Sequence, residues 1–184
     1  MEILEPEIKV EYEFWHKFLE EKVNFTHAKS SIHTKDHCRR VLLFALLIAQ
    51  KKALNAHLRS ILAKACVFHD SRRFDDGFDV GHGDRAAAFY QDFCQKHHLA
   101  YDNLVSGIMA YHDRPDVEGE KALKAFKDGV LLYHIFKDAD ALDRYRFGAL
   151  GLDPRYLRTK EALALMDFVK SQNQEVVAKF SLLP

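Results

Sequence analysis

His69 and Asp70 close an apolar segment, residues 61–68, and Arg72 and Arg73 follow almost at once. Imidazole and carboxylate groups at the end of a buried helix are typical ligands of a divalent transition metal, and cations beside them favour an anionic substrate. The dipeptide alone carries little information, because a chain with 11 histidines is expected to contain a His-Asp pair by chance. Its meaning depends on the other ionisable residues.

Five ionisable residues each extend the apolar face of a different predicted helix. Side chains at i, i+4, i+7 and i+11 share a helix face, and by this rule the apolar stripes continue to His37, His69, His82, His112 and Asp138. A buried imidazole or carboxylate without a partner is costly, whereas one divalent cation would satisfy several of them together. Taken singly, each has another explanation: a lone histidine usually bonds a backbone carbonyl, and Asp138 could cap a helix or pair with Lys137 or an arginine. The set as a whole predicts a metal site.

The elements that must position these residues are helices. Apolar residues recur at helical spacing, which predicts helices over 7–24, 36–53, 56–69, 83–98, 102–112, 120–145 (interrupted near Gly129) and 158–179. Thr34 or Asp36, Asn55 and Asp102 are suited to cap helices. No segment has the pattern of a strand, so the predicted fold class is all-α. Residues 71–81 are rich in turn formers and charges and form the loop after the His-Asp pair, and 114–120 is expected to be a surface turn.

Composition limits the class of protein. The 184 residues fit one domain, 1–184, and Lys+Arg and Asp+Glu are both 27, so no net charge favours nucleic acid or a membrane surface. Cys38, Cys66 and Cys94 are an odd number among apolar neighbours and are expected to be free thiols. The longest apolar run, 41–49, is too short to cross a bilayer, and the N-terminus lacks the pattern of a signal peptide. These features predict a cytoplasmic protein.

The spacing of His37, His69-Asp70 and Asp138 resembles that of the HD domain superfamily of metal-dependent phosphohydrolases. The segment His37-Cys-Arg-Arg-Val41 is similar to the family's opening motif, and residues 137–144 are similar to its closing aspartate helix. The resemblance covers residues 30–150. It implies a compact bundle of about six to eight helices around a central metal site held by His37, His69, Asp70 and Asp138. The first and last predicted helices would pack against this core.

Some branches of the superfamily hold two metal ions, with the counterpart of Asp70 between them. His82 and His112 are similar to the additional histidines of these branches, and His33 is similar to a histidine found in some of them. Asp113, however, stands where the second histidine of a His-His pair would be. We expect one tightly held ion of Mn, Fe, Co, Ni or Zn. Whether His82 and His112 hold a second ion or contact phosphate beside a single one stays open.

The implied reaction is hydrolysis of a small phosphorylated substrate, such as a nucleotide, by a water whose pKa the metal lowers from 15.7 to about 7. Arg72, Arg73 and Arg144 would bind phosphate oxygens. Four residues are candidates for the catalytic step, as metal ligand or as proton donor: Asp70, His33, His82 and His112.

Other assignments stay open. Asp140 and Asp143 could orient ligands or substrate, although Asp143-Arg144 could equally be a structural pair. Some relatives of the superfamily are di-iron oxygenases, but Arg72-Arg73 and the missing second histidine favour hydrolysis. A non-catalytic nucleotide or metal sensor is a further alternative. The sequence leaves homo-oligomerisation open.

Overall fold

The computed structural model describes residues 4–180, with side chains for residues 4–171. Within this range the regular structure is eight α-helices and two short 3-10 turns, Asp143–Phe147 and Pro154–Tyr156, without any strand. The helices are α1 (Pro6–Lys22), α2 (Lys35–Lys51), α3 (Ala56–Phe68), α4 (His82–Lys96), α5 (Asn103–Tyr111), α6 (Asp116–Leu123), α7 (Gly129–Leu142) and α8 (Lys160–Phe180). The predicted all-α fold class is confirmed.

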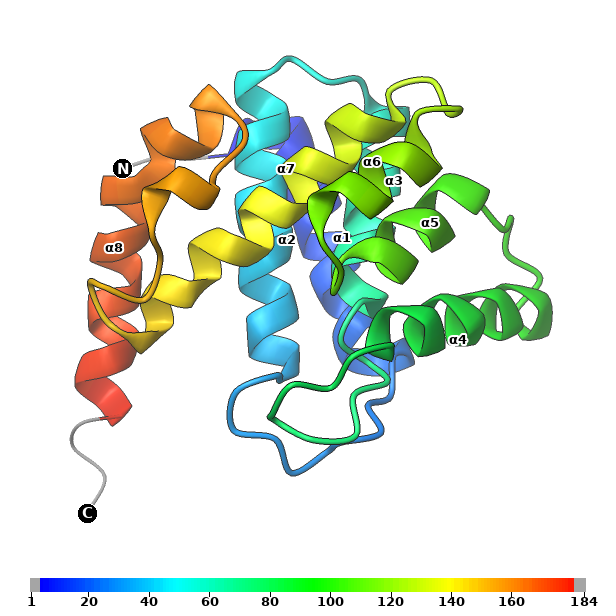
Figure 1. The fold of residues 1–184 in the computed structure, drawn as a ribbon, viewed down its shortest axis with the longest axis horizontal. Coiled ribbons are helices and arrows are strands. Elements are labelled where there is room, and N and C mark those ends of the chain that lie inside the picture. Colours follow the sequence, from blue (N-terminus) through cyan, green and yellow to red (C-terminus); the bar gives the residue numbers. More distant parts are fainter. Residues whose placement is uncertain (1–3, 181–184) are drawn as a thin grey trace.

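The central element is α2, because its apolar run over 41–49 is buried on almost every side. A helix that is apolar all round must be covered all round, and α1, α3, α7 and α8 pack against α2. Figure 1 shows α2 in the middle of the bundle, with α7 crossing it, α8 to one side and α4 and α5 to the other. The three cysteines are free and buried, as predicted. No helix in the described residues is long and apolar enough to cross a membrane.

Side-chain caps fix where the helices that carry the candidate ligands begin. Thr34 Oγ1 accepts the backbone N–H of His37 at 3.3 Å, so Thr34 rather than Asp36 caps α2. Asn55 and Asp102 cap α3 and α5 in the same way, as predicted. The cap on α2 places His37 in the first turn of that helix, where its side chain faces the ends of the neighbouring helices.

The surface turn predicted over 114–120 is wrong, because α6 begins at Asp116. Gly119 contributed to that prediction, but it lies inside the helix, where a Cβ would come within 2.3 Å of the Tyr133 ring. This glycine therefore permits close packing of α6 on α7 instead of forming a turn. The interruption predicted near Gly129 is confirmed, since α7 begins there, after Asp128 with its φ of 59°. The helix predicted over 120–145 is thus two helices.

Two loops, 23–34 and 69–81, lie together at one end of α2, in the lower part of Figure 1. The N–H of Thr26 donates to the carbonyl of Ser71 at 3.0 Å, and Ser30 and His33 both contact the carboxylate of Asp76. The start of α2, the end of α3 and the start of α4 adjoin these loops. The fold therefore gathers the ends of several helices in one place.

Candidate metal centre

Four histidines and one aspartate from different helix ends meet in the interior of the bundle. His37 lies in the first turn of α2, His69 directly follows α3, His82 begins α4 and His112 directly follows α5. Their exposed fractions are 2%, 1%, 6% and 5%, and that of Asp70 is 4%. The rings form a continuous row, with centroids 5.2 Å apart from His37 to His69, 5.2 Å from His69 to His112 and 4.6 Å from His112 to His82. The sequence predicted that these residues would meet, and the structure brings them together.

Each ring is oriented by a hydrogen bond from its Nδ1. His37 donates to Asp143 Oδ2 at 2.7 Å, and His69 donates to the carbonyl of Cys66 at 2.9 Å. His82 and His112 donate at 2.6 Å each to the carbonyls of residues 79 and 109. Carbonyl and carboxylate oxygens only accept, so all four Nδ1 atoms carry the hydrogen and the Nε2 atoms are left to bind. This is the arrangement that metal-binding histidines adopt.

The first group of ligand atoms combines His37, His69, Asp70 and Asp140. The Nε2 atoms of His37 and His69 lie 3.2 Å apart, and Asp70 Oδ2 lies 3.4 Å from the first and 3.7 Å from the second. Asp140 Oδ1 lies 3.3 Å from His37 Nε2. Two imidazoles and two carboxylates therefore converge, a donor set that suits a divalent transition metal.

The second group combines His82, His112 and the other oxygen of Asp70. The two Nε2 atoms lie 2.8 Å apart, and Asp70 Oδ1 lies 3.1 Å from that of His82 and 3.7 Å from that of His112. Asp70 thus turns one oxygen towards each pair of histidines. Both triads, His37-His69-Asp70 and Asp70-His82-His112, have ligand atoms close enough to hold an ion.

The short distances between facing Nε2 atoms indicate whether these residues fit a cation. If Nδ1 alone carries a hydrogen, His82 and His112 would point lone pairs at each other across 2.8 Å, and His37 and His69 would do the same across 3.2 Å. Such contacts between buried acceptors are unfavourable unless a proton or a cation lies between them. The donor set therefore fits a divalent ion in both groups.

The charge states of His37 and His69 differ, because only His37 contacts two further carboxylates. Burial alone would lower the pKa of His37, but hydrogen bonds with Asp140 and Asp143 outweigh it and raise this pKa to about 9. Burial lowers the pKa of His69 to about 3. Asp70, despite a burial that would raise its pKa, has a pKa well below its usual value because the neighbouring imidazoles stabilise the carboxylate. Asp70 is thus anionic at any physiological pH.

Metal binding near pH 7 is expected to release about one proton from His37. A pKa raised to about 9 leaves His37 protonated at pH 7 in the metal-free protein, and Nε2 must lose this proton before it can bind an ion. The release should therefore shrink as the pH rises through that pKa. Calorimetric titration with Mn²⁺ in buffers of different ionisation enthalpy measures it. Proton release that is the same on both sides of the pKa would contradict this assignment.

Asp138, predicted as the fourth ligand, lies elsewhere. Its Oδ2 accepts the backbone N–H and the hydroxyl of Thr159, both at 2.8 Å, and its Oδ1 accepts the backbone N–H of Arg158 at 2.9 Å and a guanidinium N–H of the same residue at 3.1 Å. It therefore secures the start of α8 and pairs with an arginine, which is the alternative to metal binding that the sequence left open for Asp138. Two residues along a helix turn the side chain by roughly 200°, so Asp140 faces the histidines instead.

The predicted phosphate-binding arginines also separate. Arg73 lies at the second group, with Nη1 3.1 Å from His82 Nε2 and 3.8 Å from Asp70 Oδ1. Arg72 is turned away, since its guanidinium donates to Asn24 and stacks on the Phe89 ring at 3.2 Å. Arg144 is exposed, and its Nε donates to the carbonyl of residue 151 at 3.0 Å. The prediction that Arg72 and Arg144 bind substrate is corrected: both are engaged away from the histidines.

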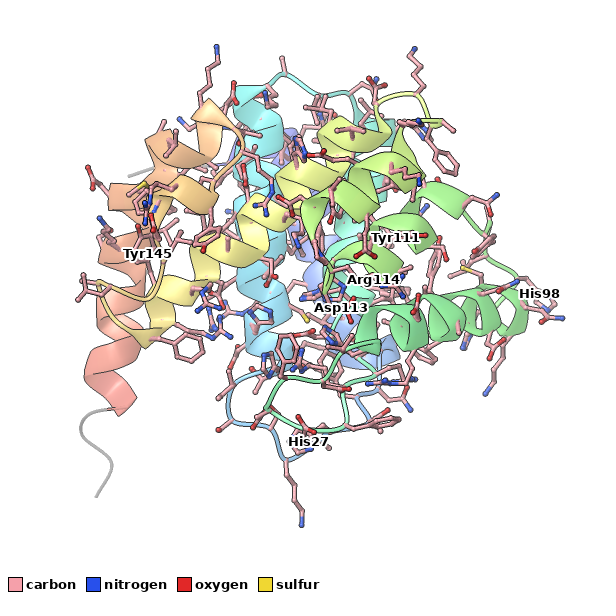
Figure 2. All side chains as sticks on the ribbon, in the orientation of Figure 1. His27, His98, Tyr111, Asp113, Arg114 and Tyr145 are labelled. Carbon is pink, nitrogen blue, oxygen red and sulfur yellow. The ribbon has the colours of Figure 1, made fainter. Side chains whose placement is uncertain are left out.

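His33 lies beside the row of histidines and outside both groups. Its Nδ1 is 3.2 Å from Asp76 Oδ1, and its ring centroid is 6.1 Å from that of His37. His27, labelled on the lower loop in Figure 2, lies 3.7 Å from the other oxygen of Asp76. Burial lowers the pKa of His33, so this ring is neutral near pH 7.

Asp113 does not take the place of a second histidine. Its Oδ2 accepts the backbone N–H groups of Gly81 at 2.7 Å and Gly83 at 3.3 Å, and it lies 3.4 Å from His82 Nδ1. Figure 2 shows Asp113 where the end of α5 meets the start of α4. It secures the start of α4 and supports the orientation of His82, so it positions a candidate ligand and belongs to neither group of ligand atoms.

Replacement of Gly83 by alanine is expected to separate His82 from His112. A Cβ at Gly83 would come within 2.4 Å of the carbonyl oxygen of Met109 and 3.1 Å of His112 Nδ1, so α4 would have to move. Metal titration of Gly83→Ala should then show the loss of the second group and retention of the first. Gly77→Ala is the control, because only a flexible carboxylate lies 3.2 Å away there. Unchanged metal stoichiometry in Gly83→Ala would contradict this role.

Arg40 is a site residue whose role sequence reasoning missed, whereas Asp143 has the ligand-orienting role that the sequence left open. Asp143 is fully buried and accepts His37 Nδ1–H at 2.7 Å, while Arg40 donates to both of its oxygens at 2.6 and 3.1 Å. The spacing of Arg40 three residues after His37 was a usable signal, since side chains at i and i+3 share a face. The carboxylate that completes this contact lies 103 residues from Arg40, and no local pattern identifies it.

Comparison with known proteins adds no assignment to this geometry. The resemblance to the HD domain superfamily therefore depends on the motif spacing and on the segments 37–41 and 137–144 of the sequence. No family model matches the chain, and neither a curated protein nor a solved structure matches it significantly.

Proposed function

We propose that this chain is a metal-dependent phosphohydrolase of the HD type that acts on a small phosphorylated substrate such as a nucleotide. One observation carries the proposal. The carboxylate of Asp70 presents Oδ2 to His37 and His69 and Oδ1 to His82 and His112, with all four distances between 3.1 and 3.7 Å. A buried carboxylate between two oriented imidazole pairs is suited to hold two divalent ions side by side, as two-metal phosphatases do.

The balance of charge supports an anionic substrate. Four carboxylates and three guanidinium groups lie at or next to the two groups: Asp70, Asp113, Asp140 and Asp143, and Arg40, Arg73 and Arg146. With neutral imidazoles these charges sum to −1, so every divalent ion that binds leaves an excess of positive charge. A phosphate monoester, with its charge of about −2 near neutral pH, would compensate it.

A divalent ion in either group would polarise a phosphoryl oxygen and supply a nucleophilic water near neutral pH. The protein's own groups have separate tasks. Arg73, buried beside His82, would bind phosphoryl oxygens through Nη1, because its Nε and Nη2 donate to the carbonyls of residues 75 and 77. His33, neutral and outside both groups, is placed to exchange a proton with bound water or leaving group. His82 and His112 are assigned to the second ion and not to proton transfer, because their Nε2 atoms face each other.

The proposal is tested by hydrolysis assays on protein loaded with Mn²⁺, Co²⁺ or Ni²⁺. We expect release of phosphate from a panel of nucleotides and other phosphomonoesters by the wild type and by His57→Ala, an exposed histidine in α3 that serves as control. His69→Ala should be inactive. Metal-loaded wild type that binds nucleotides but turns over none would favour a sensor, and activity that survives metal removal would contradict the proposed mechanism.

The two groups together are also compatible with a different reaction, because a carboxylate shared by two histidine pairs can hold two iron ions. An oxygenase of the di-iron type is therefore the second candidate. Iron content after expression in iron-rich medium and oxygen uptake with candidate organic substrates distinguish the two reactions. Oxygen consumption by the iron-loaded protein, without phosphate release by the Mn²⁺ form, would favour the oxygenase.

A further inference from the structure

Asp143 carries one negative charge but accepts hydrogen bonds from a histidine and from two arginines. Its Oδ2 accepts from His37 Nδ1 at 2.7 Å, from Arg40 Nη2 at 3.1 Å and from Arg146 Nη1 at 2.9 Å, and its Oδ1 accepts from Arg40 Nε at 2.6 Å. Arg40 alone, bound through two N–H groups, balances this carboxylate. Arg146 is therefore a surplus cation on the side of Asp143 next to His37.

Arg146 is largely buried but incompletely hydrogen-bonded. Only 10% of its side chain is exposed, and its Nε has no hydrogen-bond partner among the described residues. Its guanidinium lies 4.2 Å from the centre of the Phe147 ring, which holds the plane in place. A buried N–H group of a cation without an acceptor is unfavourable, because it loses its hydrogen bonds to water without gaining others. Arg40 already forms an ion pair with Asp143. A structural role at Asp143 therefore does not explain why Arg146 is held there with an unpartnered N–H group.

The surroundings of Arg146 indicate what its free N–H groups face. Besides Asp143, the charged groups that act on its guanidinium include Asp140, Asp70 and Arg40. Asp140 is the candidate ligand that reaches the solvent, since 34% of its side chain is exposed, against 4% for Asp70. The first group of ligands is thus reached by solvent at Asp140, and Arg146 lies next to this group, because Asp143 Oδ2 accepts from both Arg146 and His37.

We propose that Arg146 is a phosphate-binding residue of this site, in the role that the sequence suggested for Arg72 and Arg144. This inference rests on the proposed function. A phosphoryl group that entered beside Asp140 would accept hydrogen bonds from the unpartnered Nε and from the outer edge of the guanidinium. Arg73 at the second group and Arg146 at the first would then bind different oxygens of the same phosphoryl group. The ligand class is a terminal phosphate, free or esterified.

The test compares Arg146→Gln with Arg144→Gln, which removes an exposed guanidinium two residues away. Inorganic phosphate is titrated into the Mn²⁺-loaded protein and binding is followed by calorimetry. Arg146→Gln is expected to weaken phosphate binding by about ten-fold or more, whereas Arg144→Gln and wild type should agree. Metal content, measured by elemental analysis, should be equal in all three proteins. With an active substrate, KM should rise more than kcat falls, and Arg146→Lys should recover part of the affinity.

Several results would overturn the inference. Phosphate affinity that is unchanged in Arg146→Gln would do so, and so would metal-loaded wild type that binds no phosphate. Loss of bound metal together with loss of phosphate binding would make Arg146 a structural residue and would also overturn it. If phosphate binding depends on Arg146 but no phosphate ester is hydrolysed, the inference stands and the proposed function fails.

Discussion

Replacement of Asp70 by asparagine is expected to reduce kcat/KM for phosphate release by about a thousand-fold or more, equivalent to about 4 kcal/mol of transition-state stabilisation. Both oxygens of Asp70 face imidazole pairs, so one substitution disturbs both groups. An amide offers one neutral oxygen and turns an NH₂ group towards the other pair of Nε2 atoms. Loss of metal from both groups, and with it loss of the activated water, is the expected cause.

This result is measured with saturating Mn²⁺ and compared with His57→Ala prepared in the same way. Circular dichroism of both variants shows whether the helical fold is retained, because Asp70 is buried and its replacement could also destabilise the protein. Wild-type kcat/KM in a correctly folded Asp70→Asn protein would contradict the central role of this carboxylate.

Asp138 and Asp140 are expected to have opposite phenotypes although both lie on α7, two residues apart. Asp138→Ala removes the acceptor for two backbone N–H groups, the hydroxyl of Thr159 and the guanidinium of Arg158. It should lower the free energy of unfolding by about 3–5 kcal/mol, as the loss of one partner from a buried ion pair does. Well below its melting temperature, this variant should retain metal and activity.

Asp140→Asn should do the reverse. Asp140 contacts His37 Nε2 at 3.3 Å, so its replacement should weaken metal binding in the first group and lower activity by about a hundred-fold. Thermal unfolding of the metal-free protein should change less than in Asp138→Ala, because Asp143 still pairs with His37 and no helix end depends on Asp140. Thermal melts, metal titration and activity of both variants provide the measurement. An active Asp140→Asn and an inactive but stable Asp138→Ala would restore Asp138 as the ligand.

Much of the fold follows from the sequence because most of the helices have a clear apolar face or a capping residue at the start. Thr34, Asn55 and Asp102 mark helix starts by local hydrogen bonds, which depend only on near neighbours. The turn expected over 114–120 was wrong for a reason that local sequence does not contain. Gly119 is present because the ring of Tyr133 packs there, and that contact is tertiary.

The candidate site was predictable where residues end an apolar stripe and unpredictable where a helix is buried on several sides. His37, His69, His82 and His112 each continue one face, and the structure brings them together. This rule fails in α7. Asp138 is buried under the start of α8, whereas Asp140 faces the histidines and is partly exposed. A prediction based on burial therefore chooses the wrong aspartate. The orientation of Arg72 likewise depends on Asn24 and Phe89, which are distant in sequence.

The number of metal ions that the chain binds tests the proposed two-ion site most directly. Equilibrium dialysis against Mn²⁺, followed by elemental analysis, should give two ions per chain for the wild type, one for His112→Ala and none for Asp70→Asn. These ratios follow from a carboxylate that serves two histidine pairs, of which His112 belongs to one. A wild-type protein that binds no ion above the level of Asp70→Asn would contradict the account.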